Sequence, residues 1–272
     1  MTSSPLTQDH ADTVQYVSSR LSSLGKLVRI VRNWPAYFLF RLGLIKGVFR
    51  YKLRCGLSIL SRPYGIDGTC LSEVWFDAVY DPTAFGLPFD WTAARTIVDV
   101  GAHIGTFTLF AAQKAQNARI ISLEPDQSSF AILKRNIDAN ALAMRIATEN
   151  IGIGSGEDMT LYTFPENRGG NSLYRSTEGG TPVTIHTLAL KDLFDRYSVS
   201  RCDYLKLDCE GAEYEALYAL PKDYLDRIRC IGMEYHHFSL DPKHTPDNLI
   251  RFLEEAGFRV TKHRKSMLIA MR

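Results

Sequence analysis

The chain of 272 residues is 45% hydrophobic and carries a formal net charge of +2, which fits one large globular domain with additions or two small domains. The near-neutral charge gives no general case for a nucleic-acid partner, and five cysteines without a C-x-x-C pair argue against a disulfide framework or a zinc site. Residues 1–15 are too polar for a signal peptide, and the apolar stretch 34–49 is interrupted by Arg41 and Lys46, so we expect a cytoplasmic protein without a membrane span.

Positive charge is concentrated at the start of the chain. Residues 1–60 hold nine Lys or Arg and two Asp, so they carry +7 and leave −5 for the rest. Apolar residues recur here at steps of three and four, first between Tyr16 and Val31 and then at Phe38, Leu42, Ile45 and Phe49, which predicts two amphipathic helices. We expect a basic helical extension over 1–60 and a second unit over 61–272. The extension is either a cap packed on the main domain or on a second subunit, which we favour, or a peripheral membrane helix pair.

The stretch 96–124 carries the clearest pattern of the sequence. Residues 96–100 predict a buried parallel strand, Gly101 and Gly105 bracket a tight turn, and an apolar helix follows from Phe107. Such a unit points backbone N–H groups of a helix N-terminus at a ligand. The next strand, 119–123, ends at Glu124, about 20 positions beyond the turn, where an acidic residue can hydrogen-bond a ribose diol.

The residues of this turn favour a nucleoside ligand without phosphates. A dinucleotide-binding turn has glycine where this chain has His103, and Asp99 would place negative charge near the phosphates. S-adenosylmethionine (SAM) offers a ribose for Glu124 and a cationic end that Asp99 would favour. The sequence therefore favours SAM over a nicotinamide cofactor, and an ordinary βα turn with Asp99 as a structural cap is the remaining alternative.

Strands and helices alternate through the rest of the chain. Residues 55–88 are irregular, with strands or a helix expected around 72–80, and the loop 166–172 is a candidate lid. Together the elements predict an α/β fold with a doubly wound, mostly parallel sheet and an antiparallel hairpin at its edge. We expect a helix capped by Asp126 or Ser128, strands near 145–149, 159–164 and 182–186, a helix over 188–197, a strand over 203–208, a helix over 214–220, a strand over 229–233, a helix over 245–256, and strands at 258–261 and 266–271.

Ionisable side chains follow two of these strands. Asp208 and Glu210 lie at the end of the strand predicted over 203–208, and Glu234 and His236 follow the strand predicted over 229–233. Because open α/β sheets bind ligands beyond the carboxyl ends of their strands, the four should face one pocket. A carboxylate or His236 could take the proton of a hydroxyl acceptor, and His236 is preferred over His237 because it shares one side of an extended segment with Glu234.

Two further roles stay open at this pocket. Glu213 lies in the first turn of the following helix, where a carboxylate also favours the helix dipole, so a structural role suits it equally well. Asp208, Glu210 and another carboxylate could hold a divalent metal such as Mg²⁺, although their spacing does not demand one.

Several segments together resemble the FkbM-type class I SAM-dependent methyltransferases, over about residues 72–260. They are Asp-Val-Gly-Ala-His-Ile-Gly at 99–105, Leu-Glu-Pro-Asp at 123–126, Asn150, Gly-Asn-Ser-Leu at 170–173, Leu-Lys-Leu-Asp-Cys-Glu-Gly-Ala-Glu at 205–213, and the strand end at 234–236. The resemblance implies a Rossmann-like fold with a seven-stranded sheet. By position, it implies that the cofactor site is lined by Asp99, Gly101, Gly105, Glu124 and Asn150. It also implies that the acceptor is faced by Asp208, Glu210, Glu234 and His236. His103 replaces a common Asn and Ala189 a common acidic residue.

The sequence thus predicts a SAM-dependent O-methyltransferase acting on a sugar, glycan or natural-product hydroxyl. The alternatives are an NAD(P)-dependent oxidoreductase, against which His103 argues, and a non-catalytic SAM-binding scaffold, against which Asp208 and Glu210 argue. Expected partners are a small-molecule or glycan acceptor, a membrane or protein surface for residues 1–60, and a second copy in a homo-oligomer. Nucleic acid is not expected, because no Asn/Asp-Pro-Pro-Tyr-type segment and no basic stripe lie near the pocket.

Overall fold

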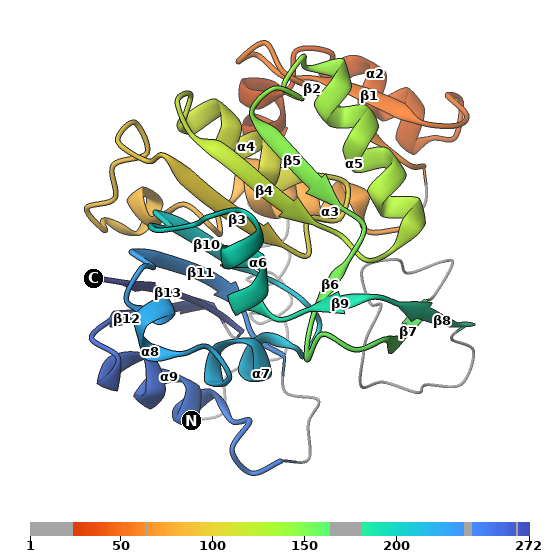
Figure 1. Ribbon diagram of the computed structural model, residues 1–272. Helices are drawn as coiled ribbons and strands as arrows, with labels where there is room; N and C mark the ends of the chain where they lie inside the picture. Colours follow the sequence, from red (N-terminus) through yellow and green to blue (C-terminus); the bar gives the residue numbers. More distant parts are fainter. Residues whose placement is uncertain (1–23, 64, 164–180, 237–240, 265) are drawn as a thin grey trace, which may run out of the picture.

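The computed structural model describes residues 24–63, 65–163, 181–236, 241–264 and 266–272 (Figure 1). The start of the first predicted helix, the candidate lid at 166–172 and His237 lie outside these residues.

A seven-stranded sheet runs through the centre of the molecule in the order β12-β13-β11-β10-β3-β4-β5. Every neighbouring pair is parallel except the two that β13 makes, which confirms the predicted sheet with an antiparallel edge hairpin. The strands are β3 (Thr96–Val100), β4 (Arg119–Leu123), β5 (Ile146–Glu149), β10 (Tyr204–Leu207), β11 (Cys230–Glu234), β12 (Arg259–Arg264) and β13 (Met267–Met271).

The strand order reverses next to β3. The chain builds β3, β4 and β5 outward in one direction and then returns to the other side of β3 with β10. The crevice beyond the carboxyl ends of β3 and β10 is therefore where this kind of sheet binds its ligand.

Helices cover both faces of the sheet, as in a doubly wound fold (Figure 1). Ile97 packs with the helices of one face and Val98 with those of the other, because successive strand residues point to opposite sides. Asp126 and Thr245 cap their helices by accepting backbone N–H groups, as predicted. One face carries α4 (Thr106–Lys114) and α5 (Gln127–Ala139); the other carries α6 (Leu190–Arg196), α7 (Glu213–Tyr218), α8 (Lys222–Leu225) and α9 (Pro246–Glu255).

Two predicted strands do not join the main sheet. β7 (Met159–Thr163) and β8 (Thr181–Ile185) pair only with each other, antiparallel, and β6 (Gly152–Ile153) pairs with β9 (Thr187–Leu188). Both segments are strands, as their residue pattern predicts. They do not extend the main sheet, since in the described part of the chain no strand pairs with the outer edge of β5. These short strands instead form a wall beside the carboxyl end of the sheet.

The extension is only partly helical, which corrects the prediction. Residues 24–30 and α2 (Trp34–Arg41) are helical, but β1 (Phe49–Lys52) and β2 (Ser58–Ser61) form an antiparallel hairpin. The second helix stops because Gly43 and Gly47 adopt φ of +73° and +78°, outside the helical region. The predicted unit boundary after residue 60 falls inside β2, and it stays a prediction.

One face of the extension packs on the main body. Val31, Phe40 and Phe49 are buried in a cluster with Ile104 and Ile132, which belong to the turn after β3 and to α5. This packing fits the favoured interpretation of a cap.

The lead-in segment between the extension and β3 is short and irregular. It contains α3 (Asp67–Leu71), a π-helical turn at Ser72–Phe76 and a 3₁₀ turn at Pro82–Phe85 that Asp81 caps.

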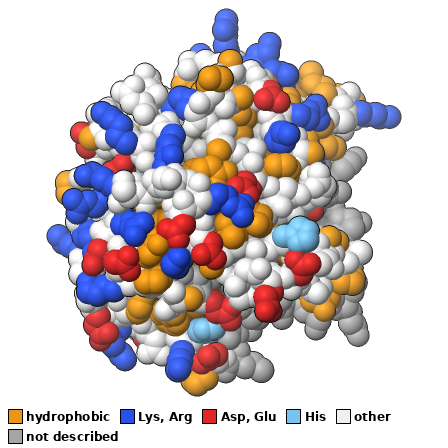
Figure 2. Space-filling view, viewed as in Figure 1, with side chains coloured by type: hydrophobic (Ala, Val, Ile, Leu, Met, Phe, Trp, Pro, Cys, Tyr) orange, Lys and Arg blue, Asp and Glu red, His pale blue; other side chains and the backbone are white. Residues whose placement is uncertain are grey.

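The surface of the molecule is mostly polar on the face that Figure 2 shows. Charged side chains are spread over this face, with small apolar patches among them. Within the described ranges, no helix combines the length and the apolar character needed to cross a bilayer.

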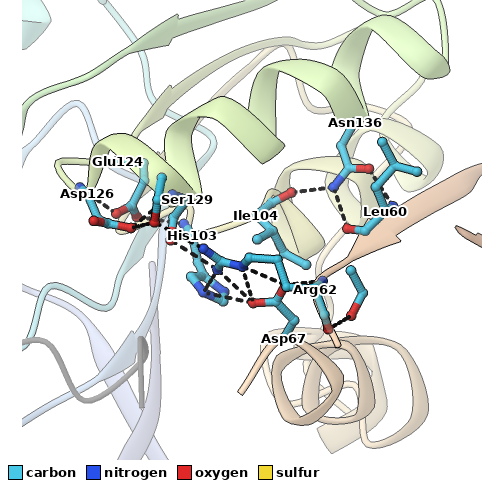
Figure 3. Close-up of polar contacts among 11 residues, drawn as sticks. Leu60, Arg62, Asp67, His103, Ile104, Glu124, Asp126, Ser129 and Asn136 are labelled. Atoms are coloured by element: carbon cyan, nitrogen blue, oxygen red, sulfur yellow. Dashed lines mark hydrogen bonds and ion pairs between the residues drawn. The ribbon is translucent and has the colours of Figure 1, made fainter. Parts of the chain in front are cut away.

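A buried amide joins the extension to the main body. Asn136 of α5 is fully buried; its Oδ1 accepts from the Leu60 N–H at 2.6 Å, and its Nδ2 donates to the carbonyl oxygens of Leu60 and Ile104 at 3.2 and 2.7 Å (Figure 3). The side chain thereby completes the edge of β2 and the turn after β3 together.

We expect Asn136→Ala to lower the free energy of unfolding by about 2–3 kcal/mol, because it leaves buried backbone groups of Leu60 and Ile104 without partners. Urea denaturation measures this. Arg135→Ala, at an exposed position one residue earlier on the same helix, should change the value by less than about 0.5 kcal/mol. Equal stabilities of the two variants would contradict the role given to the amide.

Candidate active site

A cavity of about 260 Å³ lies at the carboxyl ends of the central strands. The apolar side chains of Ile151, Ile153, Leu161 and Ile185, from β6 to β8 and the loop before them, form part of its wall. Seven of the ten predicted site residues line it: Gly101, His103, Glu124, Asp208, Glu210, Glu234 and His236.

The two strand ends at the switch point meet at a glycine. Gly101 has φ of +75°, and a Cβ placed on it would lie 1.8 Å from the carbonyl oxygen of Asp208. No other residue fits there without moving the backbone, so this glycine is required by the close approach of β3 and β10.

Glu124 is held in place by backbone donors. Its two carboxylate oxygens accept from the N–H groups of His103 at 2.7 Å and Asp126 at 2.8 Å. Burial raises the pKa of Glu124 to about 7, although these hydrogen bonds oppose the shift. The carboxylate is thus fixed in the cavity wall with lone pairs left for a ligand hydroxyl.

Three predicted site residues lie outside the cavity lining and support it instead. Asp99 is fully buried, where its Oδ2 accepts from Thr108 at 2.6 Å and its Oδ1 lies 3.4 Å from Lys206. Gly105 begins α4 in close contact with Leu133. The Asn150 amide donates to the carbonyl oxygens of Glu124 and Pro125. The structure thus places Asp99, Gly105 and Asn150 behind the cavity lining, and their direct contact with a cofactor stays a prediction.

His103 is clamped by two residues that the sequence pattern did not single out. The Arg62 guanidinium lies 2.9 Å from His103 Nε2 and 2.7 Å from Asp67 Oδ1 (Figure 3). Since a guanidinium only donates, Nε2 accepts and the imidazole is neutral. Burial lowers the pKa of His103 to about 4, Asp67 opposes this shift, and Arg62 adds to it. Nothing in the lead-in segment marked Arg62 or Asp67, because their pairing arises only from the tertiary fold.

Asp208 sits among partners that favour its ionised form. Its Oδ2 accepts from the Tyr80 hydroxyl at 3.0 Å and lies 3.4 Å from the buried Lys206 ammonium. Burial raises its pKa, but the charges of Lys206 and His236 outweigh burial and hold the pKa below the usual value. Tyr80 and Lys206 contact Asp208 but are not among the predicted site residues, although Lys206 lies within the family-like segment and Tyr80 in an aromatic stretch before β3.

Glu210 and Glu234 are carboxyl groups of the cavity whose pKa values are raised. Burial raises the pKa of Glu210 to about 8, against the opposing charge of His236. Burial and then the charge of Asp208 raise the pKa of Glu234, whose Oε1 accepts from Ser266 at 3.0 Å. Glu210 also has φ of +54°, a conformation that is strained for a residue with a side chain and that often marks functional positions.

His236 is tied to a carboxylate behind the cavity. Its Nδ1 lies 3.0 Å from Oε1 of the fully buried Glu213, which also accepts the backbone N–H groups of Cys209 and Gly211. Burial alone would lower the pKa of His236, but the hydrogen bond and charge of Glu213 raise it to about 10. His236 is therefore cationic at neutral pH, and its Nε2 lies 3.7 Å from Glu210.

Three side chains of the site could hold a divalent metal. Asp208, Glu234 and His236 each offer one ligand atom, and these atoms lie within 4.8 Å of one another. Two oxygens and a nitrogen suit a divalent cation. An ion would have to displace the proton of His236, and Lys206 already balances Asp208 while Ser266 donates to Glu234, so the arrangement does not require a metal.

Comparisons with known proteins find similar methyltransferases. The profile described as "Methyltransferase FkbM domain" matches residues 99–260. The chain is 27% identical over 198 residues to methyltransferase sdnD of Sordaria araneosa, covering 62% of this chain and 75% of that one. It is 28% identical over 158 residues to the hexuronic acid methyltransferase AglP of Haloferax volcanii, covering 58% and 61%. A solved FkbM methyltransferase from Methylobacillus flagellatus is similar with a TM-score of 0.45 and 15% identity, over 75% and 53% of the chains.

Replacing Glu213, the carboxylate that raises the pKa of His236, tests the electrostatics of the site. We expect Glu213→Gln to lower the pKa of His236 from about 10 towards the ordinary value, as an NMR titration of the imidazole would show. The pKa of His236 is higher in the folded protein than in the unfolded chain, where it is near 6.5. The Glu213–His236 pair therefore stabilises the fold fully below about pH 6.5, and this stabilisation is lost as the pH rises through about 10. The stability deficit of Glu213→Gln should shrink over that range. Glu215→Gln, exposed on the same helix, should leave the His236 pKa unchanged.

Proposed function

Because the chain belongs to the FkbM methyltransferase family, we propose that it transfers a methyl group from SAM, its cofactor, to a hydroxyl oxygen of a sugar, a glycan or a natural-product small molecule. The observation that carries the proposal is the switch-point cavity, with Glu124 at one place in its wall and Asp208, Glu210, Glu234 and His236 at another. The name of the Haloferax volcanii relative, a hexuronic acid methyltransferase, supports a carbohydrate acceptor.

The residues of the cavity suit the chemical groups of SAM. Glu124 would accept hydrogen bonds from the ribose hydroxyls, because its carboxylate is held in the cavity wall with free lone pairs. The apolar wall of Ile151, Ile153 and Leu161 offers a surface for the adenine. The ionised Asp208 favours a positive centre nearby.

Since SAM brings an already activated methyl group, the protein has to orient the acceptor and take its proton. We assign the proton to Glu210, because a carboxylate with a raised pKa is a stronger base than an ordinary one and this side chain lines the cavity. The acceptor oxygen forms its bond to the methyl carbon as the bond to sulfur breaks, and the hydroxyl proton passes to Glu210. His236 already carries a proton at neutral pH, so we assign it to orienting Glu210 rather than to acting as the base.

The two alternatives make different demands on the site. A nicotinamide-dependent enzyme would need a turn that admits a pyrophosphate, and the clamped His103 stands where that turn needs glycine. A non-catalytic SAM-binding scaffold would not need a carboxyl group with a raised pKa in the cavity, where Glu210 has one.

Calorimetric titration with SAM and with NADH tests the cofactor site. We expect SAM to bind and Glu124→Gln to weaken binding by about 1.5–3 kcal/mol, the value of a hydrogen bond to a charged group. Since the pKa of Glu124 is raised to about 7, wild-type affinity should increase between pH 6 and pH 8, and the variant should lose this dependence. Glu157→Gln, at an exposed position, serves as the control. Binding of NADH without SAM would overturn the assignment.

The pH dependence of turnover tests the base. With an acceptor found by screening sugars and hydroxylated small molecules, kcat/KM should rise with pH through about 8, the pKa of Glu210. Glu210→Gln should lose this rising limb and about 10²–10⁴-fold of the rate while still binding SAM. Glu254→Gln, exposed on α9, should retain both. An unchanged pH profile of kcat/KM in Glu210→Gln would show that another group takes the proton of the acceptor. Binding of SAM without turnover of any acceptor would favour a non-catalytic SAM-binding scaffold.

A further inference from the structure

The outer end of the extension exposes apolar side chains that the main body does not cover. We name residues 38–48, which contain the end of α2 and the turn into β1, the N-terminal tip. It holds five of the eight large hydrophobic residues that are exposed in the described part of the chain. Leu42 and Leu44 are 72% and 70% exposed, and Leu39, Phe38 and Val48 are exposed beside them. Apolar exposure is therefore concentrated at one place rather than scattered singly over the surface.

The tip is anchored from its inner side. Phe40 and Phe49 are buried, and their rings stack with centroids 4.7 Å apart. The leucines of the turn thus project from a segment whose opposite face belongs to a packed cluster. Their exposure is a property of the folded tip, because the buried phenylalanines on either side fix the turn that carries them.

The charge around the tip has a single sign. The sequence has no Asp or Glu between Asp12 and Asp67, whereas residues 24–63 contain nine Lys or Arg. Within that stretch, the ion pairs that the described residues form involve Lys26 and Arg62. Arg41 and Lys46 lie in the tip itself, are exposed, and have no carboxylate within ion-pair distance among the described residues. An anionic partner is the electrostatic complement of this surface.

We propose that the N-terminal tip docks on an anionic membrane surface. In this arrangement Leu42 and Leu44 enter the boundary between headgroups and acyl chains, and Arg41 and Lys46 lie at the lipid phosphates. Projecting leucines flanked by cations combine the two attractions of an interfacial segment, apolar burial and electrostatic attraction, without any membrane-spanning helix.

Two other occupants fit the same surface less well. A nucleic acid would satisfy the cations, but the leucine side chains have no group that reads or stacks on a base. A second copy of the chain in a two-fold contact would bring one positively charged tip against another, which like charges oppose. A bilayer with anionic headgroups suits both the leucines and the cations.

Co-sedimentation of the full chain with vesicles tests the proposal. We expect binding to phosphatidylcholine vesicles that contain phosphatidylglycerol, little binding to phosphatidylcholine alone, and weakening by salt. Leu42→Ser/Leu44→Ser should reduce partitioning about tenfold or more. Arg41→Gln and Lys46→Gln should each reduce it about fivefold. Met144→Ser removes a side chain that is 97% exposed on the main body, and it should have no effect.

Each result decides the proposal. Binding of SAM and the melting temperature should be the same in Leu42→Ser/Leu44→Ser as in the parent chain, because both leucines are exposed and lie outside the cavity. Absence of vesicle binding, or vesicle binding that the leucine variant retains, would overturn the proposal. A shift of the parent chain to a dimer that this variant abolishes would assign the tip to a second copy. Binding of single-stranded RNA that the Arg41 and Lys46 variants weaken and the leucine variant does not would assign it to nucleic acid.

Discussion

A buried ammonium group joins the two central strands, and the site depends on it. Lys206 of β10 is only 3% exposed; its Nζ donates to the Gly101 carbonyl oxygen at 2.7 Å and lies 3.4 Å from both Asp99 and Asp208. A lone buried charge would cost several kcal/mol, so the carboxylates on the two strands have to stay beside it. The ends of β3 and β10 are thereby fixed against each other, and their contact at Gly101 shapes the cavity.

Charges alternate across the strand ends beyond this lysine. From the interior towards β11, carboxylates and cations follow one another: Asp99, Lys206, Asp208, His236 and Glu213. Opposite charges nearby lower the pKa of Asp208 and raise the pKa values of Lys206 and His236, which stabilises the ionised forms of these three groups, whereas burial raises the pKa of Asp99. Glu210 and Glu234 stand at the margin of this array, and burial leaves them with raised pKa values. Proton exchange near neutral pH is thus concentrated in the carboxyl groups that line the cavity.

The fold was predictable from sequence because its strands and helices have strong periods and clear caps. The cavity residues that end strands, such as Glu124 and Asp208, could be found for the same reason. Position alone could not tell that Asp99 faces the interior, because that depends on which side of β3 meets Lys206. The sequence does not place Arg62 and Tyr80 at the site, because they come from irregular segments whose position is set by packing. The sequence predicts a helix at Phe49, where the structure has a hairpin, because the apolar residues before it also fit a helical spacing.

The contacts of His103 also show where the folding unit of this chain begins. The family match begins at residue 99, yet Arg62 contacts both His103 and the first turn of α5 through Ser128 and Ser129. Asn136 ties β2 to the same helix. Residues 58–67 therefore fold as one unit with the turn at 101–105 and with α5, although the family profile does not include them. A chain cut after residue 67 would lose one wall of that turn.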